Sequence, residues 1–283
     1  MQESPIDKRS LLLTLLFSLF IIAFIIAKHY GFDDYVVFCD VGEGDAAIIR
    51  LENGYDIVVD AGPDASSLEC LGRYLPFWDK TIELAILSHP DLDHYGGFEF
   101  IKDRYRIDSL IVNESTGKDK RFSKLLDSLA ASKTTKTRLS SFFQGDSIGI
   151  KPFRIVFCWP KTGQRVVNDN DYSSIFVFEK NGFKVGFTGD ASPWALNSSF
   201  DDIGDNCQKS MEKVDILKVP HHGSKQGLTE KFLRLADPEV AVISVGKNNP
   251  YGHPSNVILD LLKAKKIKTL RTDEKGDIVF KIP

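Results

Sequence analysis

The segment Ser88-His-Pro-Asp-Leu-Asp-His-Tyr-Gly-Gly97 directly follows an apolar run, Leu84-Ala-Ile-Leu87, and carries four side chains that could bind a metal. These are His89, Asp91, Asp93 and His94. Imidazole and carboxylate groups both suit divalent cations. A strand that ends at Leu87 would lead into a tight loop whose alternate side chains point one way, with His94 opening a helix. A solvated polar loop is the alternative, but this alternation behind an apolar strand favours a metal-dependent hydrolase.

Two later segments place further potential ligands where apolar runs stop. Asp190 ends Val185-Gly-Phe-Thr-Gly-Asp190, and two adjacent histidines follow Asp215-Ile-Leu-Lys-Val-Pro220. We expect these strand ends to converge with the first loop on one site. Of the two histidines, His221 ends the strand directly and is the preferred ligand. His222 is left to contact substrate or to stabilise the turn.

These segments together resemble the metallo-β-lactamase-fold hydrolases. The signatures of that family are an Asp, a His-x-His-x-Asp-His loop, a His, an Asp and a His. In this sequence they correspond to Asp60 in Val-Asp-Ala-Gly62, the loop 89–94, a position near 170, Asp190 and His221. The resemblance implies an α/β fold, a four-layer αββα sandwich. In it, Asp60 would orient a ligand or the loop by hydrogen bonds rather than bind metal itself.

Five motifs in order resemble more closely the hydrolase domain of ComEC-type competence proteins, over about residues 35 to 282. The motifs are Phe38-Cys-Asp-Val-Gly-Glu-Gly-Asp-Ala46, Ser88-His-Pro-Asp-Leu-Asp-His94, Leu217-Lys-Val-Pro-His-His-Gly-Ser224, Ser244-Val-Gly-Lys-Asn-Asn-Pro-Tyr-Gly-His-Pro254 and Arg271-Thr-Asp-Glu-Lys-Gly-Asp277. The chain lacks the many membrane helices of the full-length family, so it can resemble only the hydrolase part. By this resemblance, phosphodiester cleavage is the leading reaction and single-stranded DNA the leading nucleic-acid substrate.

Two ligand positions depart from the general lactamase-fold pattern. Asp91 replaces the second histidine of the loop, as in the ComEC type, and near the third signature Asn170 or Asp171 is the best spaced candidate. Oxygen ligands shift the preference toward harder ions, so we favour manganese, with zinc as the runner-up, in a site for one or two divalent ions. The family arrangement implies His89, Asp91 and Asn170 on one ion, Asp93, His94 and His221 on the other, and Asp190 between them.

The expected chemistry needs no side-chain nucleophile, because two divalent cations lower the pKa of a shared water and neutralise developing charge. A Gly-x-Ser-x-Gly elbow and a cysteine–histidine couple are both missing, which disfavours acyl-enzyme chemistry. The candidates for catalysis are Asp93, His222, Ser224 and His253. His253 could protonate a leaving alkoxide, and Ser224 or Tyr251 could hold a phosphate oxygen. Alternatively, Tyr251-Gly-His-Pro254 only turns the chain.

The N-terminus is a separate unit by its composition. Residues 11–27 carry no charge and follow Lys8 and Arg9. As a helix they would span about 26 Å, slightly less than a hydrocarbon core of roughly 30 Å. We expect residues 1–30 to form a single-pass anchor in a lipid bilayer, with residues 31–283 as an extracytoplasmic hydrolase domain. A cleaved signal peptide is the main alternative.

Apolar runs and turn signals outline an α/β domain. The expected strands are Tyr35–Phe38, Ala46–Leu51, Ile57–Asp60, Leu84–Leu87, Ser109–Val112, Phe153–Phe157, Ile175–Phe178, Val185–Phe187, Ile216–Val219, Val240–Val245, Lys268–Arg271 and Ile278–Ile282. The expected helices are Phe122–Ala131, Glu230–Ala236 and Ser255–Lys263. Cys39 and Cys158 lie in strand-like runs and read as buried thiols, while Cys70 and Cys207 could pair only if the fold brings them together.

The charge balance argues against a chain that binds nucleic acid over its whole surface. There are 36 basic and 39 acidic residues, for a net charge of −3, so no overall excess would attract a phosphate backbone. A local patch remains possible, because Lys218, Lys225 and Lys247 flank the expected site. Two alternatives therefore stay open: a hydrolase of a carboxylic ester, thioester or lactam, and a metal-free binding domain without catalysis.

Overall fold

Two seven-stranded sheets form the centre of the protein. The computed structural model describes residues 7–30, 33–113, 119–131, 136–164, 168–200 and 206–283. The first sheet has the order β14 (Ile278–Lys281), β1 (Tyr35–Phe38), β2 (Ala46–Arg50), β3 (Asp56–Ala61), β4 (Thr81–Leu87), β5 (Arg106–Val112), β6 (Arg138–Ser140). The second has the order β13 (Lys268–Arg271), β12 (Val240–Ile243), β11 (Ile216–Lys218), β10 (Phe183–Phe187), β9 (Ile175–Lys180), β8 (Phe153–Trp159), β7 (Ser147–Ile150).

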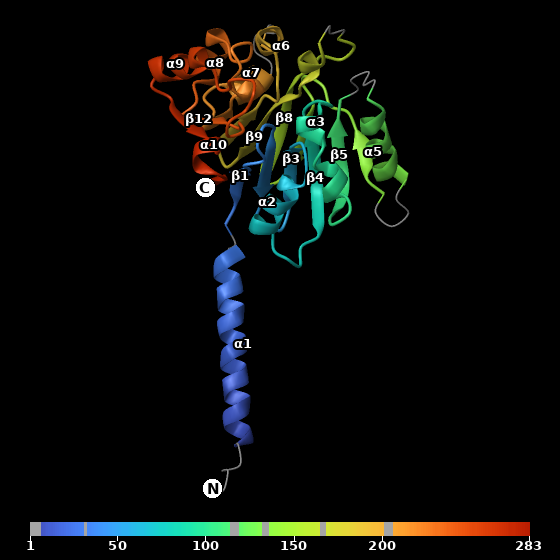
Figure 1. The fold of residues 1–283 in the computed structure, drawn as a ribbon, viewed down its shortest axis with the longest axis vertical. Coiled ribbons are helices and arrows are strands. Elements are labelled where there is room, and N and C mark those ends of the chain that lie inside the picture. Colours follow the sequence, from blue (N-terminus) through green and yellow to red (C-terminus); the bar gives the residue numbers. More distant parts are fainter. Residues whose placement is uncertain (1–6, 31–32, 114–118, 132–135, 165–167, 201–205) are drawn as a thin grey trace.

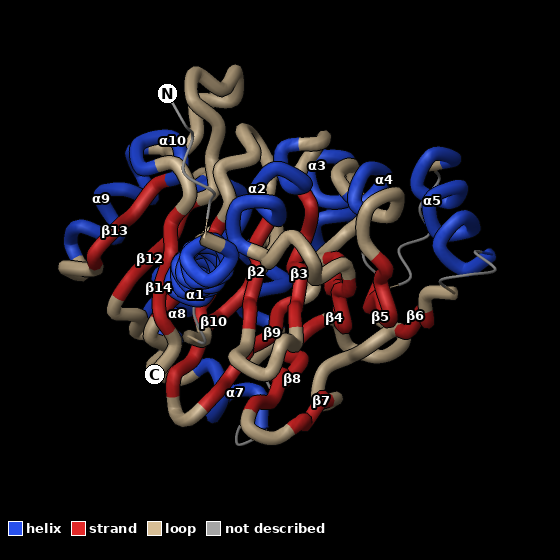
Figure 2. Tube along the Cα trace, turned by 90° about the horizontal axis from the view of Figure 1, so that it is seen from below, coloured by secondary structure: helices blue, strands red, loops and turns tan. Residues whose placement is uncertain are grey.

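Helices cover the outer face of each sheet and complete a four-layer sandwich (Figures 1 and 2). On the first sheet lie α2 (Ser66–Tyr74), α3 (Leu92–Tyr95), α4 (Phe98–Ile101) and α5 (Lys120–Ala131). On the second lie α6 (Pro193–Ser198), α7 (Asn206–Met211), α8 (Glu230–Ala236) and α9 (Asn256–Ala264). The short helix α10 (Thr272–Lys275) joins β13 to β14, and α1 (Lys8–Tyr30) precedes β1. The predicted αββα sandwich is confirmed.

Three apolar layers hold the sandwich together. One lies between the two sheets, where Phe38, Phe176 and Phe187 pack with ring centroids 5.0–5.9 Å apart. The other two lie under the helices on either side. β3 is buried along its whole length, as expected for a strand covered on both faces. Burial on both faces explains why the apolar runs of the sequence outline the strands so well.

Parallel strand pairs bring the ends of distant segments to one edge. β3 pairs parallel with β4, and β10, β11 and β12 pair parallel with one another. Because parallel strands end at the same edge of a sheet, the segments after β10 and β11 meet there. The segment after β4, in the other sheet, reaches the same place, since the Ser174 N–H donates to the Ser88 carbonyl at 2.9 Å. In Figure 1, α3 lies at this end of β3 and β4. The convergence of strand ends expected from the sequence is therefore present.

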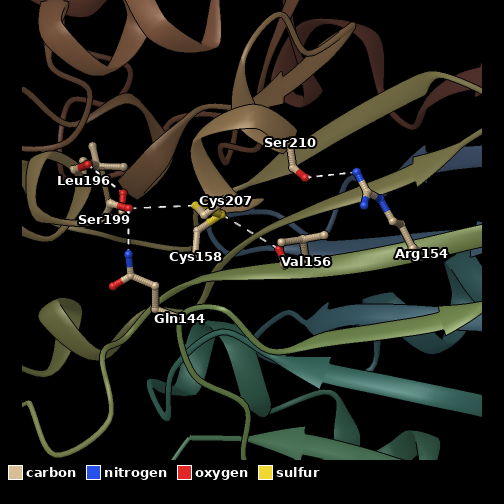
Figure 3. The surroundings of a disulfide bond; sticks show 8 residues. All are labelled: Gln144, Arg154, Val156, Cys158, Leu196, Ser199, Cys207 and Ser210. Atoms are coloured by element: carbon tan, nitrogen blue, oxygen red, sulfur yellow. Dashed lines mark hydrogen bonds between the residues drawn. A yellow bond between two sulfur atoms is a disulfide. The ribbon is translucent and has the colours of Figure 1, made fainter. Parts of the chain in front are cut away.

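The cysteines differ from the sequence interpretation. Cys39 is bonded to Cys70 and Cys158 to Cys207, with Cα–Cα distances of 6.1 and 5.1 Å. The interpretation of Cys39 and Cys158 as buried thiols was wrong, because α2 brings Cys70 to Cys39, directly after β1, and α7 brings Cys207 to Cys158 in β8. Figure 3 shows the second bond, which joins β8 to α7.

The N-terminal prediction is not confirmed. Among the described parts of the chain, no helix combines the length and the apolar character needed to cross a membrane. The side chains described in α1 are exposed.

Candidate metal centre

Four side chains from three separate segments meet at the edge where the strands end. They are Asp93, His94, Asp190 and His222, here called the four-ligand group, and their potential ligand atoms all lie within 4.8 Å of one another. His94 Nε2 is 3.2 Å from Asp190 Oδ1, and His222 Nε2 is 3.4 Å from Asp93 Oδ2 and 3.6 Å from Asp190 Oδ2. Such an arrangement of two imidazoles and two carboxylates suits a divalent cation.

Close backbone packing places the loop that supplies Asp93 and His94. This loop follows β4, and α3 begins immediately after Asp91. A Cβ on Gly97 would come within 1.9 Å of the Ala61 carbonyl oxygen, so only glycine lets α4 approach β3 this closely. Gly97 thus lets the segment that follows His94 pack directly against β3.

Hydrogen bonds hold His94 with its Nε2 toward the group. Its Nδ1 is 3.0 Å from Asp60 Oδ2 and 3.2 Å from Ser88 Oγ. Asp60 is held in turn, because its Oδ1 accepts the Ser88 backbone N–H at 2.7 Å. A carboxylate on the far nitrogen of a histidine fixes the tautomer and raises its basicity toward a metal. Asp60 therefore orients a ligand and does not belong to the four-ligand group.

A buried ion pair underlies the other histidine. Lys218 Nζ pairs with Asp45 and donates a hydrogen bond to the Gly189 carbonyl at 3.2 Å. His222 Nδ1 lies 3.0 Å from the Ser244 carbonyl oxygen and 3.4 Å from Asp45 Oδ1. Lys218 is buried beneath the site, so of the three lysines expected to flank it, this one is not part of an exposed patch. Asp45 thus supports the site from beneath, although its motif gave no sign that Lys218 is its partner.

Opposite charges shift the pKa values of the buried side chains in the four-ligand group. Burial alone would raise the pKa of Asp190, but His222 and His94 outweigh it and hold that pKa well below its usual value. Burial would lower the pKa of His222, yet Asp190 and Asp45 raise it to about 10. The pKa of His94 is likewise raised, against burial, by Asp190 and Asp60. The carboxylates are ionised and ready to bind a cation.

Unsatisfied polar atoms show that the residues fit a metal ion. Within the described residues, the buried side-chain atoms without a hydrogen-bond partner include His89 Nε2, His94 Nε2, Asp190 Oδ1 and His222 Nε2, all at this edge. Buried polar atoms are nearly always satisfied in proteins. A cation bound between these atoms would satisfy them, because divalent cations accept nitrogen and oxygen ligands.

The other residues expected to bind metal lie beside the group. His89 Nε2 is 3.4 Å from Asp91 Oδ2, and the charge of His89 contributes to the lowered pKa of Asp190. Asn170 Nδ2 is 3.4 Å from His221 Nδ1, and His221 Nε2 is 3.8 Å from Asp190 Oδ2. The four expected ligands outside the group, His89, Asp91, Asn170 and His221, therefore lie nearby. The structure brings His222 rather than His221 into the four-ligand group.

Ser224 and His253 occupy different surroundings. The Ser224 N–H donates to the His221 carbonyl at 2.7 Å, and its hydroxyl oxygen accepts the Gln226 N–H at 3.3 Å, so this residue closes a turn. His253 lies at the site, with its ring centroid 5.8 Å from that of His221 and its Nδ1 3.1 Å from Glu43 Oε1. Glu43 was missed at the sequence level, although it stands in a quoted motif.

The sequence-family model of the metallo-β-lactamase superfamily matches residues 39–247 of this chain. The chain belongs to this superfamily. A metallo-β-lactamase-fold protein, YhfI from Bacillus subtilis, superposes with a TM-score of 0.59 at 16% identity, over 88% of this chain and 100% of that one. Zn²⁺-bound PqqB from Methylobacterium extorquens gives a TM-score of 0.56 at 8% identity, over 88% and 100%. At these identities the solved structures show the fold alone.

The names of two curated relatives refer to competence and to recombination. ComE operon protein 3 of Bacillus subtilis is 29% identical over 71% of this chain and 25% of its own length. Recombination protein 2 of Haemophilus influenzae is 29% identical over 84% and 28%, and Competence protein ComA of Neisseria gonorrhoeae 26% identical over 85% and 31%. The chain spans about a quarter to a third of these relatives. The suspected likeness to the ComEC-type hydrolase domain is confirmed.

Proposed function

We propose that this metallo-β-lactamase-superfamily hydrolase is a phosphodiesterase that cleaves single-stranded DNA. The four-ligand group carries the proposal, because it presents ionised carboxylates and unpaired imidazole nitrogens at one edge of a rigid sandwich. The names of the relatives, Competence protein ComA and Recombination protein 2, support DNA as the substrate class. A lactamase-type fold by itself fits many ester substrates.

The residues present would hold one ion in the four-ligand group. A second ion, in this proposal, would be held by His89, Asp91, Asn170 and His221, which lie beside the group. Manganese is the preferred metal, since oxygen ligands contribute strongly to both positions, and zinc is the runner-up. A bound divalent ion would supply Lewis-acid stabilisation of phosphate charge and lower the pKa of water to near neutrality.

The remaining side chains would orient the substrate. His253 is fixed at Nδ1 by Glu43, and its imidazolium form would donate from Nε2 to a phosphate or leaving-group oxygen. Lys225 and Lys247 are exposed on the two loops that border the site, where they provide positive charge for a phosphate backbone. Ser224 stabilises the turn that carries His221 and His222, and we propose no contact between it and the substrate.

The test combines metal analysis with cleavage by the full chain. Labelled single- and double-stranded DNA, a phosphate diester reporter and a carboxylic ester reporter are each incubated with manganese, magnesium and zinc. We expect cleavage of single-stranded DNA and of the diester, with loss of both in Asp190→Asn. Asp103→Asn, at an exposed surface position, is the matched control.

Each contrary outcome contradicts a different part of the proposal. Intact DNA with every ion, together with cleavage of the diester reporter, would reject DNA as the substrate and leave the phosphodiesterase assignment. Turnover of the carboxylic ester alone would reject phosphodiester chemistry. Protein that binds none of the three ions would reject a hydrolase of any kind.

A further inference from the structure

The loop between β12 and α9 packs tightly against the loop between β1 and β2. The Gly246 N–H donates to Glu43 Oε2 at 2.7 Å. A Cβ on Gly246 would lie 2.6 Å from the Glu43 backbone nitrogen, so the two loops touch at their backbones. The contact joins segments some 200 residues apart in sequence. This contact holds the loop between β12 and α9 in place at the edge of the site.

Contacts with Glu43, Asn249 and His222 hold His253 in this loop. Glu43 Oε1 lies 3.1 Å from its Nδ1, and Asn249 Oδ1 accepts its backbone N–H at 3.0 Å. Asn249 Nδ2 donates to the carbonyl oxygens of His253 at 2.7 Å and Gly246 at 3.0 Å. The imidazole ring stacks against His222 with centroids 6.3 Å apart. The ring plane of His253 is therefore set relative to the four-ligand group.

Tyr251 extends this arrangement by one ring toward solvent. Its ring lies nearly parallel to that of His253, at 23° and 5.7 Å between centroids. Yet Tyr251 is 69% exposed, more than any other large hydrophobic or aromatic side chain described. An exposed ring adds little to the stability of the core. Its orientation on a fixed imidazole, next to a metal centre, calls for a functional explanation.

We propose that Tyr251, backed by His253 and Glu43, is a stacking platform for an unpaired nucleobase next to the scissile phosphate. The proposal rests on the proposed function, whose substrate class it deepens. Aromatic rings stack on any base without sequence preference. Bases within a duplex already stack on both faces, so the platform selects single strands. Lys247, exposed on the same loop, lies where it can neutralise a neighbouring phosphate.

The experiment measures binding, so it does not depend on turnover. The full chain, in EDTA so that the strand is not cleaved, is titrated against a fluorescein-labelled oligothymidylate and against the same strand with abasic sugars, by fluorescence anisotropy. Tyr251→Ala should weaken binding of oligothymidylate by about 5- to 150-fold. Tyr251→Phe should bind like the wild type, because it keeps the ring. Phe77→Ala removes a 65% exposed ring elsewhere on the surface and should have no effect.

The abasic strand separates stacking from other contacts. Wild type and Tyr251→Ala should bind it equally, because it offers no base to the ring. Equal loss on both strands, or a loss in Tyr251→Phe as large as in Tyr251→Ala, would overturn the platform and point to a hydroxyl–phosphate contact. Cleavage of the strand with no dependence on Tyr251 would overturn the platform alone. Tyr251-dependent binding without cleavage under any ion would keep the platform and reject the nuclease.

Discussion

Replacement of Asp60 by asparagine should weaken metal binding, although Asp60 lies outside the four-ligand group. The carboxylate accepts two hydrogen bonds, from the Ser88 backbone N–H at 2.7 Å and at His94 Nδ1 at 3.0 Å. Asparagine keeps one acceptor and presents an amide nitrogen to the other donor. If this nitrogen faces His94, the ring must accept at Nδ1, and its Nε2 then carries the proton and cannot bind a metal.

The expected magnitude follows from this loss of one acceptor. Removing the partner that orients a histidine ligand costs about 10- to 100-fold in metal affinity, or ~1.4–2.7 kcal/mol. In the opposite amide orientation the buried Ser88 N–H loses its partner, which costs ~1–3 kcal/mol of stability instead. Competition with a chromophoric chelator measures the first effect, and urea unfolding of the metal-free protein measures the second. An Asp60→Asn protein with wild-type values in both assays would refute the role assigned to Asp60.

Three further predictions concern protonation, cross-linking and packing. Nearby carboxylates raise the pKa of His222 to about 10 despite burial. The protonated His222 side chain therefore stabilises the metal-free fold. This stabilisation is complete below about pH 6.5 and is lost as the pH rises through about 10. A metal binds only neutral imidazole, so affinity should rise with pH across this window by up to about tenfold per unit for each proton displaced, and calorimetry in buffers of different ionisation enthalpy should detect proton release. Replacing Cys158 and Cys207 together by alanine should lower the free energy of unfolding by ~4 kcal/mol in urea titrations, because the bond closes a loop with a sequence separation of 49; a loss below about 1 kcal/mol would contradict this. Gly97→Ala places a Cβ 1.9 Å from the Ala61 carbonyl oxygen, so thermal unfolding should show a loss of at least ~1–3 kcal/mol, and an unchanged midpoint would be inconsistent with the close packing of α4.

Strands of this protein could be predicted because most are apolar along their whole length. The bounds of β1 (Tyr35–Phe38) and of α8 (Glu230–Ala236) were predicted to the residue. α8 also begins with a strong signal, since the Thr229 hydroxyl oxygen accepts the Phe232 N–H at 3.1 Å. Helices α2, α6 and α7 were missed. They have six to nine residues, and so short a helix depends on packing against its sheet more than on its own sequence.

The metal centre was predictable where ligands cluster in one loop, and less so where they come from afar. Asp93 and His94 follow the apolar strand β4, and Asp190 follows the apolar strand β10, so the sequence marks the end of each strand. The supporting contacts of Asp45 and Glu43 join segments more than 170 residues apart. The spacing of residues along the sequence cannot predict such contacts, because they depend on how the two sheets pack.

The sequence also could not decide which of His221 and His222 points toward the four-ligand group. Along an extended strand, alternate side chains face opposite ways, so either histidine could point inward. Both instead take left-handed backbone conformations, with φ of 51° and 50°, at a cost of roughly 1–2 kcal/mol each. Tertiary contacts impose this turn: the His221 N–H donates to the Gly189 carbonyl at 3.1 Å, and His222 Nδ1 meets the Ser244 carbonyl at 3.0 Å. With Nδ1 held there, Nε2 of His222 faces Asp93 and Asp190, and the strained turn persists because it completes the four-ligand group.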